Sequence, residues 1–261
     1  MRDGRTPARS AAPHALVRWA APWTLAIVLL GLWWLAAGSV PRFLLPDPGS
    51  VFVRLVRDLS SPQWYGFFGA TLAEALGGCV LGAVVALPLA VLLHRSPVAA
   101  AATDPFLGAT QAVPAIAVAP LLVLWVGYGF GAIVVLCGVM VFFPILVSSV
   151  LGLRHVPGSL VDAARMDGAG SWALLAHIEA PLALASVLAG LRTGFTLSVT
   201  GAVVGEMVMG GRGLGALLTA LRDQMDTAGM FATIIVLCVA ASVIYSLIRW
   251  WEHRSRLVNI D

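Results

Sequence analysis

Long uncharged stretches alternate with short polar ones along most of this chain. The uncharged runs cover about residues 19–41, 75–94, 105–153, 184–204 and 227–248, with one arginine in the fourth. An α-helix needs about 20 apolar residues to cross a bilayer. The third run is too long for one span, and the glycine-rich turn Gly127–Gly131 divides it into two. The pattern predicts an all-α integral membrane protein with about six transmembrane helices.

The two ends of the chain differ in composition from its middle. Residues 1–18 are rich in Arg, Pro and Ala without apolar periodicity, which predicts a disordered tail. We expect a transmembrane domain over 19–251 and a short tail over 252–261. The first apolar run could also be a cleaved signal peptide, since arginines precede it and small residues follow at 36–38. We favour an uncleaved span, because the run is long and further spans follow.

A short polar segment after the first span predicts an interfacial helix, capped by Ser50 and ending near Leu59. Its apolar and charged residues fall on opposite faces. The apolar face holds Val51, Leu55, Val56 and Leu59, and the other holds Arg54, Arg57 and Asp58. Such a helix could shape an outer docking surface or could simply connect two spans.

Glycines spaced four residues apart recur inside the predicted spans. Such pairs allow two membrane helices to approach closely. They are Gly78 with Gly82, Gly190 with Gly194, and Gly201 with Gly205. The one arginine within a span, Arg192, is costly there, so we expect it to face the bundle or to reach toward the cytoplasmic surface.

The most informative polar segment is 154–181. It predicts two short helices joined by a glycine turn: Ser159 would cap a helix over 160–167, and Gly168 would end it. Ser171 would then cap a second helix over 172–178, which Pro181 would end or redirect.

The first of these helices is suited to fit into a groove of another protein. Ala163 and Ala164 leave one face nearly bare, so a groove in another protein could approach the backbone closely. Asp162 and Arg165 flank that face with charge. The pattern therefore predicts a docking helix for a partner protein.

Composition supports a membrane protein and excludes an ATPase of the P-loop class. Hydrophobic residues make up 59% of the 261 residues, charged residues 11%, and the mean hydropathy is +0.92. All 16 basic residues are arginines, so no lysine can complete a Walker A loop. Any ATP and Mg²⁺ must therefore be bound by a partner. The net charge of +3 does not indicate nucleic acid, because the arginines are scattered at span ends.

The distribution of arginines predicts the orientation. Six spans place both termini on one side, together with the 94–104 loop and the 154–181 segment. Ten arginines lie on that side: Arg2, Arg5, Arg9, Arg18, Arg95, Arg154, Arg165, Arg249, Arg254 and Arg256. Five lie on the other: Arg42, Arg54, Arg57, Arg212 and Arg222. The positive-inside rule therefore places the termini and the 154–181 segment in the cytoplasm.

Catalytic and metal-binding patterns are missing from the sequence. There are no paired acids at catalytic spacing, no Ser, His and Asp set, no HExxH and no nucleophile elbow, and the cysteines and histidines lack metal-ligand spacing. A solute path remains, and polar side chains within the spans could line it. These are Gln111, Ser148, Ser149, Thr193, Thr196, Ser198 and Thr200. The alternative for each hydroxyl is a hydrogen bond back to a helix carbonyl or across to another helix.

The segment 161–181 resembles the coupling loop of membrane subunits of binding-protein-dependent ATP-binding-cassette importers. That family has EAA, three residues, G, and then an apolar residue and P about thirteen residues after the G. The matching positions are Asp162, Ala163, Ala164, Gly168, Ile178 and Pro181, with Asp162 in place of Glu and Ala180 in place of Leu. The resemblance runs from about 45 to 218. Within this family, the chain looks most like the nitrate, sulfonate, taurine and vitamin-precursor branch. The stretches that carry this likeness are LPDPGSV, QAVPAIAVAPLLVLWVGYG, FFPILVSS, and GEMV with GRGLG.

This resemblance implies the type I importer permease fold and a set of partners in a bacterial inner membrane. They are an ATPase dimer that carries ATP and Mg²⁺, an extracytoplasmic solute-binding protein, and a second permease subunit, expected to be identical. It also implies that Glu206, Gly213 and Gly215 lie near an external gate, where a surface salt bridge from Glu206 to Arg212 is the alternative. A stand-alone secondary transporter or channel is the competing function, and an intramembrane enzyme is a third.

Overall fold

The computed structural model describes residues 12–110 and 114–254, and helices are the only regular secondary structure within these ranges. The first six helices are α1 (Ala12–Ser39), α2 (Pro48–Leu59), α3 (Pro62–Arg95), α4 (Pro97–Thr110), α5 (Ala115–Val126) and α6 (Phe130–Arg154). The others are α7 (Gly158–Met166), α8 (Ser171–Leu174), the π-helical turn η1 (Leu175–Glu179), α9 (Ala180–Met209), α10 (Leu214–Asp223) and α11 (Thr227–Arg254). The predicted all-α fold is confirmed.

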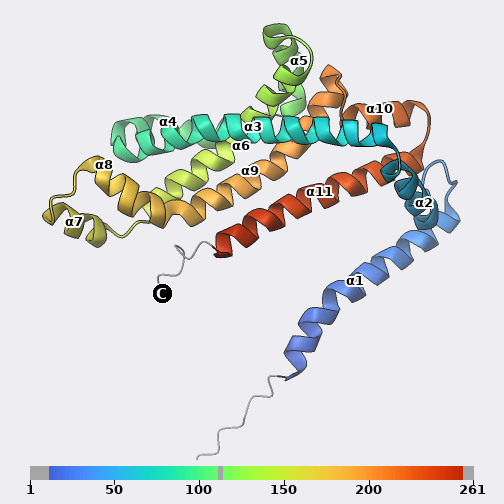
Figure 1. The fold of residues 1–261 in the computed structure, drawn as a ribbon, viewed down its shortest axis with the longest axis horizontal. Helices are drawn as coiled ribbons and strands as arrows, with labels where there is room; N and C mark the ends of the chain where they lie inside the picture. Colours follow the sequence, from blue (N-terminus) through green and yellow to red (C-terminus); the bar gives the residue numbers. More distant parts are fainter. Residues whose placement is uncertain (1–11, 111–113, 255–261) are drawn as a thin grey trace, which may run out of the picture.

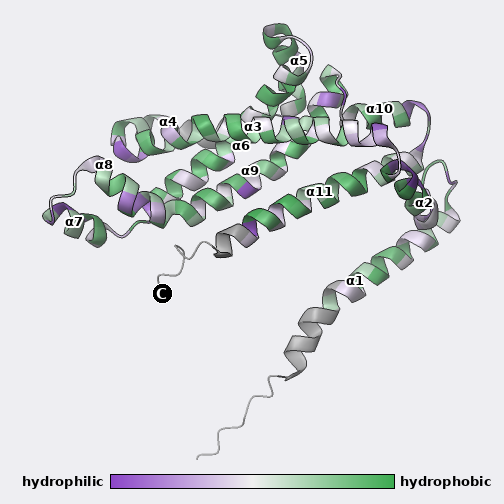
Figure 2. Cartoon of the chain, in the orientation of Figure 1, coloured by the Kyte–Doolittle hydropathy of each residue, from purple (hydrophilic) through white to green (hydrophobic). Residues whose placement is uncertain are grey.

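Four helical segments of the described chain are long and apolar enough to cross a membrane. They are 62–95, 130–154, 171–209 and 227–250. Two shorter apolar helices, 23–39 and 116–126, correspond to the first and third predicted spans. Figure 1 shows the long helices running side by side, with α7 and α8 at one end and α2 and α10 at the other. Hydrophobic colour covers most of their length, and hydrophilic residues gather toward the two ends (Figure 2).

The core of the molecule lies where α3, α6 and α9 meet. Its buried side chains include Ile133, Leu136, Cys137 and Phe195. The predicted close approach of glycines is confirmed: a Cβ on Gly82 would lie 2.9 Å from the Gly138 carbonyl oxygen. Glycines on α9 make equivalent contacts with α6, where a Cβ on Gly194 would lie 2.8 Å from Val141 Cγ1. These contacts fix the three helices against one another.

The third predicted span is divided. α4 begins at Pro97, inside the predicted loop, and α5 is a separate helix of 12 residues. Pro114 is the N-cap of α5, a place where its missing N–H is not needed. α5 projects away from the long helices in Figure 1, and α1 diverges from them on another side. The predicted glycine turn before α6 is confirmed, with positive φ at Gly127 and Gly129.

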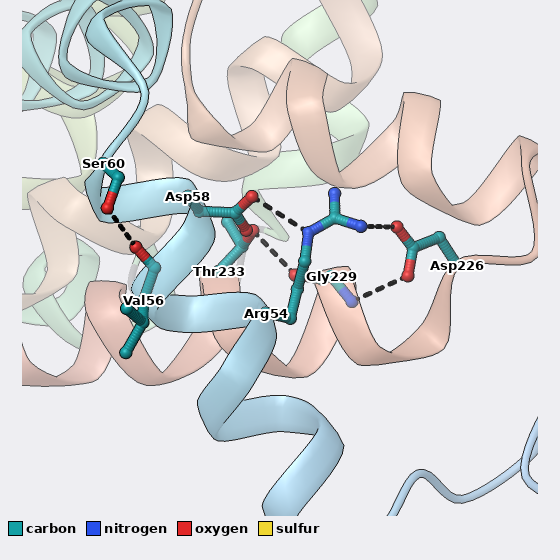
Figure 3. Close-up of polar contacts among 7 residues, drawn as sticks. All are labelled: Arg54, Val56, Asp58, Ser60, Asp226, Gly229 and Thr233. Carbon is teal, nitrogen blue, oxygen red and sulfur yellow. Dashed lines mark hydrogen bonds and ion pairs between the residues drawn. The ribbon is translucent and has the colours of Figure 1, made fainter.

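The predicted facing of the helix after the first span is wrong in part. α2 is capped by Asp47, whose side chain accepts a hydrogen bond from the Ser50 N–H, rather than by Ser50. That bond lowers the pKa of the Asp47 carboxyl. Arg54 does not face away: it pairs with Asp58 on α2 and with Asp226 at the start of α11 (Figure 3). The counter-charge just before α11 draws Arg54 and Asp58 partly inward, whereas Val56 and Leu59 are exposed together with Arg57.

Candidate functional site

The helix α7 stands at one end of the bundle and has no buried residue. Among the described residues, its main contacts are with α8 and η1. Asp162 and Ala163 are exposed, Ala164 is half-buried, and Arg165 is exposed. An Arg165 nitrogen lies 3.6 Å from an Asp162 carboxylate oxygen. The small residues and the charged pair predicted for a docking helix thus lie together on a protruding element.

Gly168 ends α7 in the geometry that only glycine adopts readily. Its φ is +86°, and its N–H donates to the Arg165 carbonyl at 3.0 Å. The next N–H, that of Ala169, donates to the Ala164 carbonyl at 2.9 Å. This pair of bonds is the Schellman motif, which satisfies carbonyls left open at a helix end. The predicted break at Gly168 is confirmed.

The rest of the segment differs from its prediction. Pro157, not Ser159, is the N-cap of α7, and Ser171 is the first residue of α8 without capping it. Pro181 does not end a helix, because α8, η1 and α9 form one helical run over 171–209. Proline is tolerated in a helix's first turn, and Pro181 is the second residue of α9, directly after the π-helical turn.

Two bulky apolar side chains on this segment are exposed, and the sequence did not lead us to include them among the docking residues. Met166 is 89% exposed and Trp172 is 78% exposed, although the surrounding segment is polar. Large apolar side chains that protrude from a polar loop are typical anchors of a protein interface. For Trp172, the signal was present in the sequence as an isolated tryptophan between the glycine turn at 168–170 and the next span.

At the other end of α9, a buried carboxylate holds the first turn of α10. Glu206 is 1% exposed and accepts a short hydrogen bond from the Gly215 N–H. The neighbouring Leu214 N–H donates to the Thr71 hydroxyl of α3 at 2.8 Å. Helix N-termini favour negative charge and leave N–H groups open, so both acceptors stabilise this end of α10.

The glycines of the GRGLG turn make room for this carboxylate. A Cβ on Gly213 would collide with the Glu206 carboxyl group, and one on Gly215 with the Val203 carbonyl. The alternative of a surface salt bridge does not describe Glu206, because its side chain points inward while Arg212 is exposed. Glu206, Gly213 and Gly215 therefore form one packed unit.

A second acid, Glu74 on α3, lies close enough to Glu206 to interact with it. Glu74 is 3% exposed, and within the part of the chain that the structure describes, one oxygen of each carboxyl has no hydrogen-bond partner. From the sequence, Glu74 lies just before the second span, but α3 begins at Pro62 and carries it into the core. No local pattern pointed to this pair.

The polar residues predicted within the spans separate into an exposed and a buried group. Thr193, Thr196 and Thr200 are exposed on one face of α9, and the Thr196 and Thr200 hydroxyls bond back to carbonyls one turn earlier. Ser198 is fully buried and donates to the Ala75 carbonyl of α3 at 2.6 Å, so it fastens two helices instead of facing outward. Ser148 is half-buried at the α6–α9 contact beside Gly190. Gln111 lies outside the described residues.

Arg192 contacts the neighbouring helix α11. Its guanidinium carbon lies 4.8 Å from the centre of the Tyr245 ring, a distance at which a cation and an aromatic face attract. The side chain is half-buried. The structure thus places Arg192 toward the bundle, beside the exposed threonines of α9.

Comparison with known proteins identifies a transport family. Residues 78–257 match the family described as "Binding-protein-dependent transport system inner membrane component". The chain is 39% identical over 224 residues to the riboflavin transport system permease protein of Chloroflexus aurantiacus, covering 85% of this chain and 84% of that protein. It is 32% identical to the formylaminopyrimidine transport permease protein of Halalkalibacterium halodurans, covering 87% and 91%.

Solved structures share the fold. A chain of the inward-facing MetNI methionine ABC transporter superposes with a TM-score of 0.60 at 21% identity, covering 71% of this chain and 90% of that one. The predicted type I importer permease fold is therefore confirmed. With helices long and apolar enough to cross a membrane and a family match that covers more than half of its residues, this chain belongs to the inner membrane components of binding-protein-dependent transport systems.

Proposed function

We propose that this chain is the permease subunit of an ATP-driven importer and that α7 is the helix on which the ATPase acts. The observation that carries this proposal is the protruding helix itself, closed by Gly168 and joined through α8 and η1 to α9. A partner that holds α7 can displace a rigid element that enters the core. ATP and Mg²⁺ would be bound by that partner and not by this chain.

The contact residues of this interface would be those of the exposed helix and its turn. We assign Asp162, Ala163, Ala164, Arg165 and Gly168 to it and add Met166 and Trp172 for their exposure. Pro181 would act indirectly, as a fixed point at the start of α9. Since ATP can shift the permease only through different interactions with two ATPase states, this joint must be stiff.

The solute path would follow the exposed threonine face of α9. Thr193, Thr196 and Thr200 support this by their exposure, whereas Ser198 is left out because it is buried. A second permease subunit, identical to this one, would close the path on its other side. Glu206, Gly213 and Gly215, which hold the start of α10, would form part of the external gate.

The solute we propose is a small molecule handed over by an extracytoplasmic binding protein. The relatives named above, together with aliphatic sulfonate and taurine permeases, define the range: flavin- or pyrimidine-type vitamin precursors, sulfonates and taurine, with nitrate as a further candidate. Riboflavin is the first solute to test, because that relative shares 39% of its residues with this chain.

The decisive experiment compares Gly168→Val with Gly170→Val in a complex reconstituted with its ATPase and binding protein. Both sites have open space around the α-carbon, but Gly168 has φ +86° and Gly170 has φ −73°. Valine strains the backbone only at the first. We expect Gly168→Val to abolish the ATP hydrolysis stimulated by loaded binding protein, and Gly170→Val to retain it. Normal stimulation in Gly168→Val would refute the role of α7.

The orientation is tested separately, with a cysteine at Ala163 in a cysteine-free background. We expect no labelling by a membrane-impermeant thiol reagent in intact cells and full labelling in inside-out vesicles. Labelling from outside would place α7 away from any ATPase. A stand-alone transporter or channel, in contrast, would move the solute without an ATPase subunit.

A further inference from the structure

Two basic residues at the end of α3 reach across to the helix that follows α7. Arg95 Nη2 donates to the Ser171 carbonyl and to Glu179 Oε2, each at 2.8 Å. His94 Nε2 lies 3.5 Å from the other Glu179 oxygen. Ser171 begins α8 and Glu179 ends η1. One guanidinium therefore contacts both ends of the short helical run between α7 and α9.

The carboxylate at the centre of this cluster is nearly removed from solvent. The Glu179 side chain is 4% exposed, against 29% for Arg95 and 20% for His94. A buried carboxylate is costly unless it is paired and hydrogen-bonded, and charge-assisted bonds are stronger than neutral ones. Because the Glu179 carboxylate depends on Arg95, the contact resists separation more than a surface ion pair would.

The position of the Arg95–Glu179 cluster allows it to transmit a movement of α7 to α3. α7 packs against α8 and η1, and this run continues directly into α9. A displacement of α7 therefore reaches α9 through the chain itself. At this end of the bundle, the run contacts α3 through this cluster and through Val91 of α3, which packs against the small apolar cluster of Leu153, Leu175 and Ala183. Farther along, α3 packs directly on α6 and α9.

We propose that Arg95 and Glu179 form a strut that makes α3 follow α7. They are positioning residues, and the proposal rests on the proposed function of α7 as the ATPase contact. With the strut intact, α3 and α9 would move as one body when the ATPase closes. Without it, the end of α3 nearest α8 would follow α7 less closely, although the core contacts of α3 with α6 and α9 remain, so the binding of solute outside would be less tightly linked to ATP hydrolysis inside.

The test uses conservative variants first, because charge reversal in a buried place can prevent folding. Arg95→Lys keeps the charge but replaces the guanidinium, whose Nη2 makes both bonds, with an ammonium on a shorter side chain. Glu179→Gln keeps the shape but removes the charge. In the complex reconstituted with its ATPase and binding protein, we expect each to lower stimulated ATP hydrolysis roughly fivefold or more, the lower end of typical couplings between distant sites. Hydrolysis without binding protein and copurification of the ATPase should stay at wild-type levels.

Two further variants separate a strut from a general effect on this turn. His177→Ala alters the same π-helical turn, but His177 is exposed, and its hydrogen bond within the described residues is to the Ala173 carbonyl one turn earlier in the same helical run. It should couple normally. The double exchange Arg95→Glu with Glu179→Arg should recover stimulation that each reversal alone abolishes.

The outcomes distinguish this proposal from the one it rests on. If wild-type complex shows no stimulation by loaded binding protein, the proposed function fails. If wild-type is stimulated and Arg95→Lys and Glu179→Gln respond equally well, the strut alone is refuted. An equal loss in His177→Ala also refutes the strut.

Discussion

At the residue scale, the GRGLG turn is held in place by hydrogen bonds from single backbone N–H groups. The Leu214 N–H has one acceptor, the Thr71 hydroxyl, and both groups are buried. The Gly215 N–H donates to the Glu206 carboxylate. A buried N–H without an acceptor costs its full desolvation, whereas exchanging one acceptor for another costs little. The turn should therefore respond to the loss of an oxygen atom and not to small changes of volume.

Thr71→Val tests this because valine matches threonine in shape and lacks the hydroxyl. We expect Thr71→Val to destabilise the protein by about 1–3 kcal/mol, the cost of one unsatisfied buried group. Thr71→Ser keeps the oxygen and should stay closer to wild-type. Thermal unfolding of the detergent-solubilised protein measures both. A serine variant less stable than the valine variant would show that volume, and not the hydrogen bond, governs this position.

At the element scale, α2 is attached to α11 through one carboxylate with two functions. Asp226 pairs with Arg54, and its other oxygen accepts from the Gly229 N–H at 2.9 Å, which caps the start of α11 (Figure 3). Asparagine is as good a cap as aspartate, whereas alanine caps poorly. The Asp226 and Arg54 side chains are 25% and 27% exposed, so solvent weakens the ion pair.

The two contributions separate in a pair of variants. Asp226→Asn removes the ion pair and should cost less than about 1 kcal/mol. Asp226→Ala also removes the cap and should cost about 1 kcal/mol more. Chemical or thermal unfolding in detergent gives the difference. If the two variants are equally stable, the bond to Gly229 contributes nothing to stability.

At the scale of the whole molecule, local patterns were readable from the sequence and distant contacts were not. The apolar runs, the glycine pairs and the turn at Gly168 each depend on a few neighbouring residues, and these predictions are confirmed. The bond between Thr71 and Leu214 joins residues 143 apart, and the neighbouring carboxyls of Glu74 and Glu206 meet only once α3 packs on α9. Helix continuity through Pro181 was missed because a π-helical turn precedes it.

The same packing decides which polar residues of α9 can meet the solute. Thr196 and Ser198 are two positions apart, so they point to different sides of one helix, and a sequence alone cannot say which side is open. The structure leaves Thr196 exposed and buries Ser198 against α3. An exposed polar face is unfavourable against lipid, which supports a water-filled path or a second subunit beside it.

Cysteine accessibility tests this assignment directly in a variant without native cysteines. A water-soluble thiol reagent should modify Thr196→Cys and Thr200→Cys in the assembled complex, and loaded transport cycles should change the rate. Ser198→Cys should stay unmodified because it is buried. Val243→Cys on α11 is the matched control: Val243 is 51% exposed but apolar, so lipid should shield it. Equal modification at 196 and 243 would mean that exposure alone, and not a water-filled path, explains the reaction; no modification at 196 would move the path to another face.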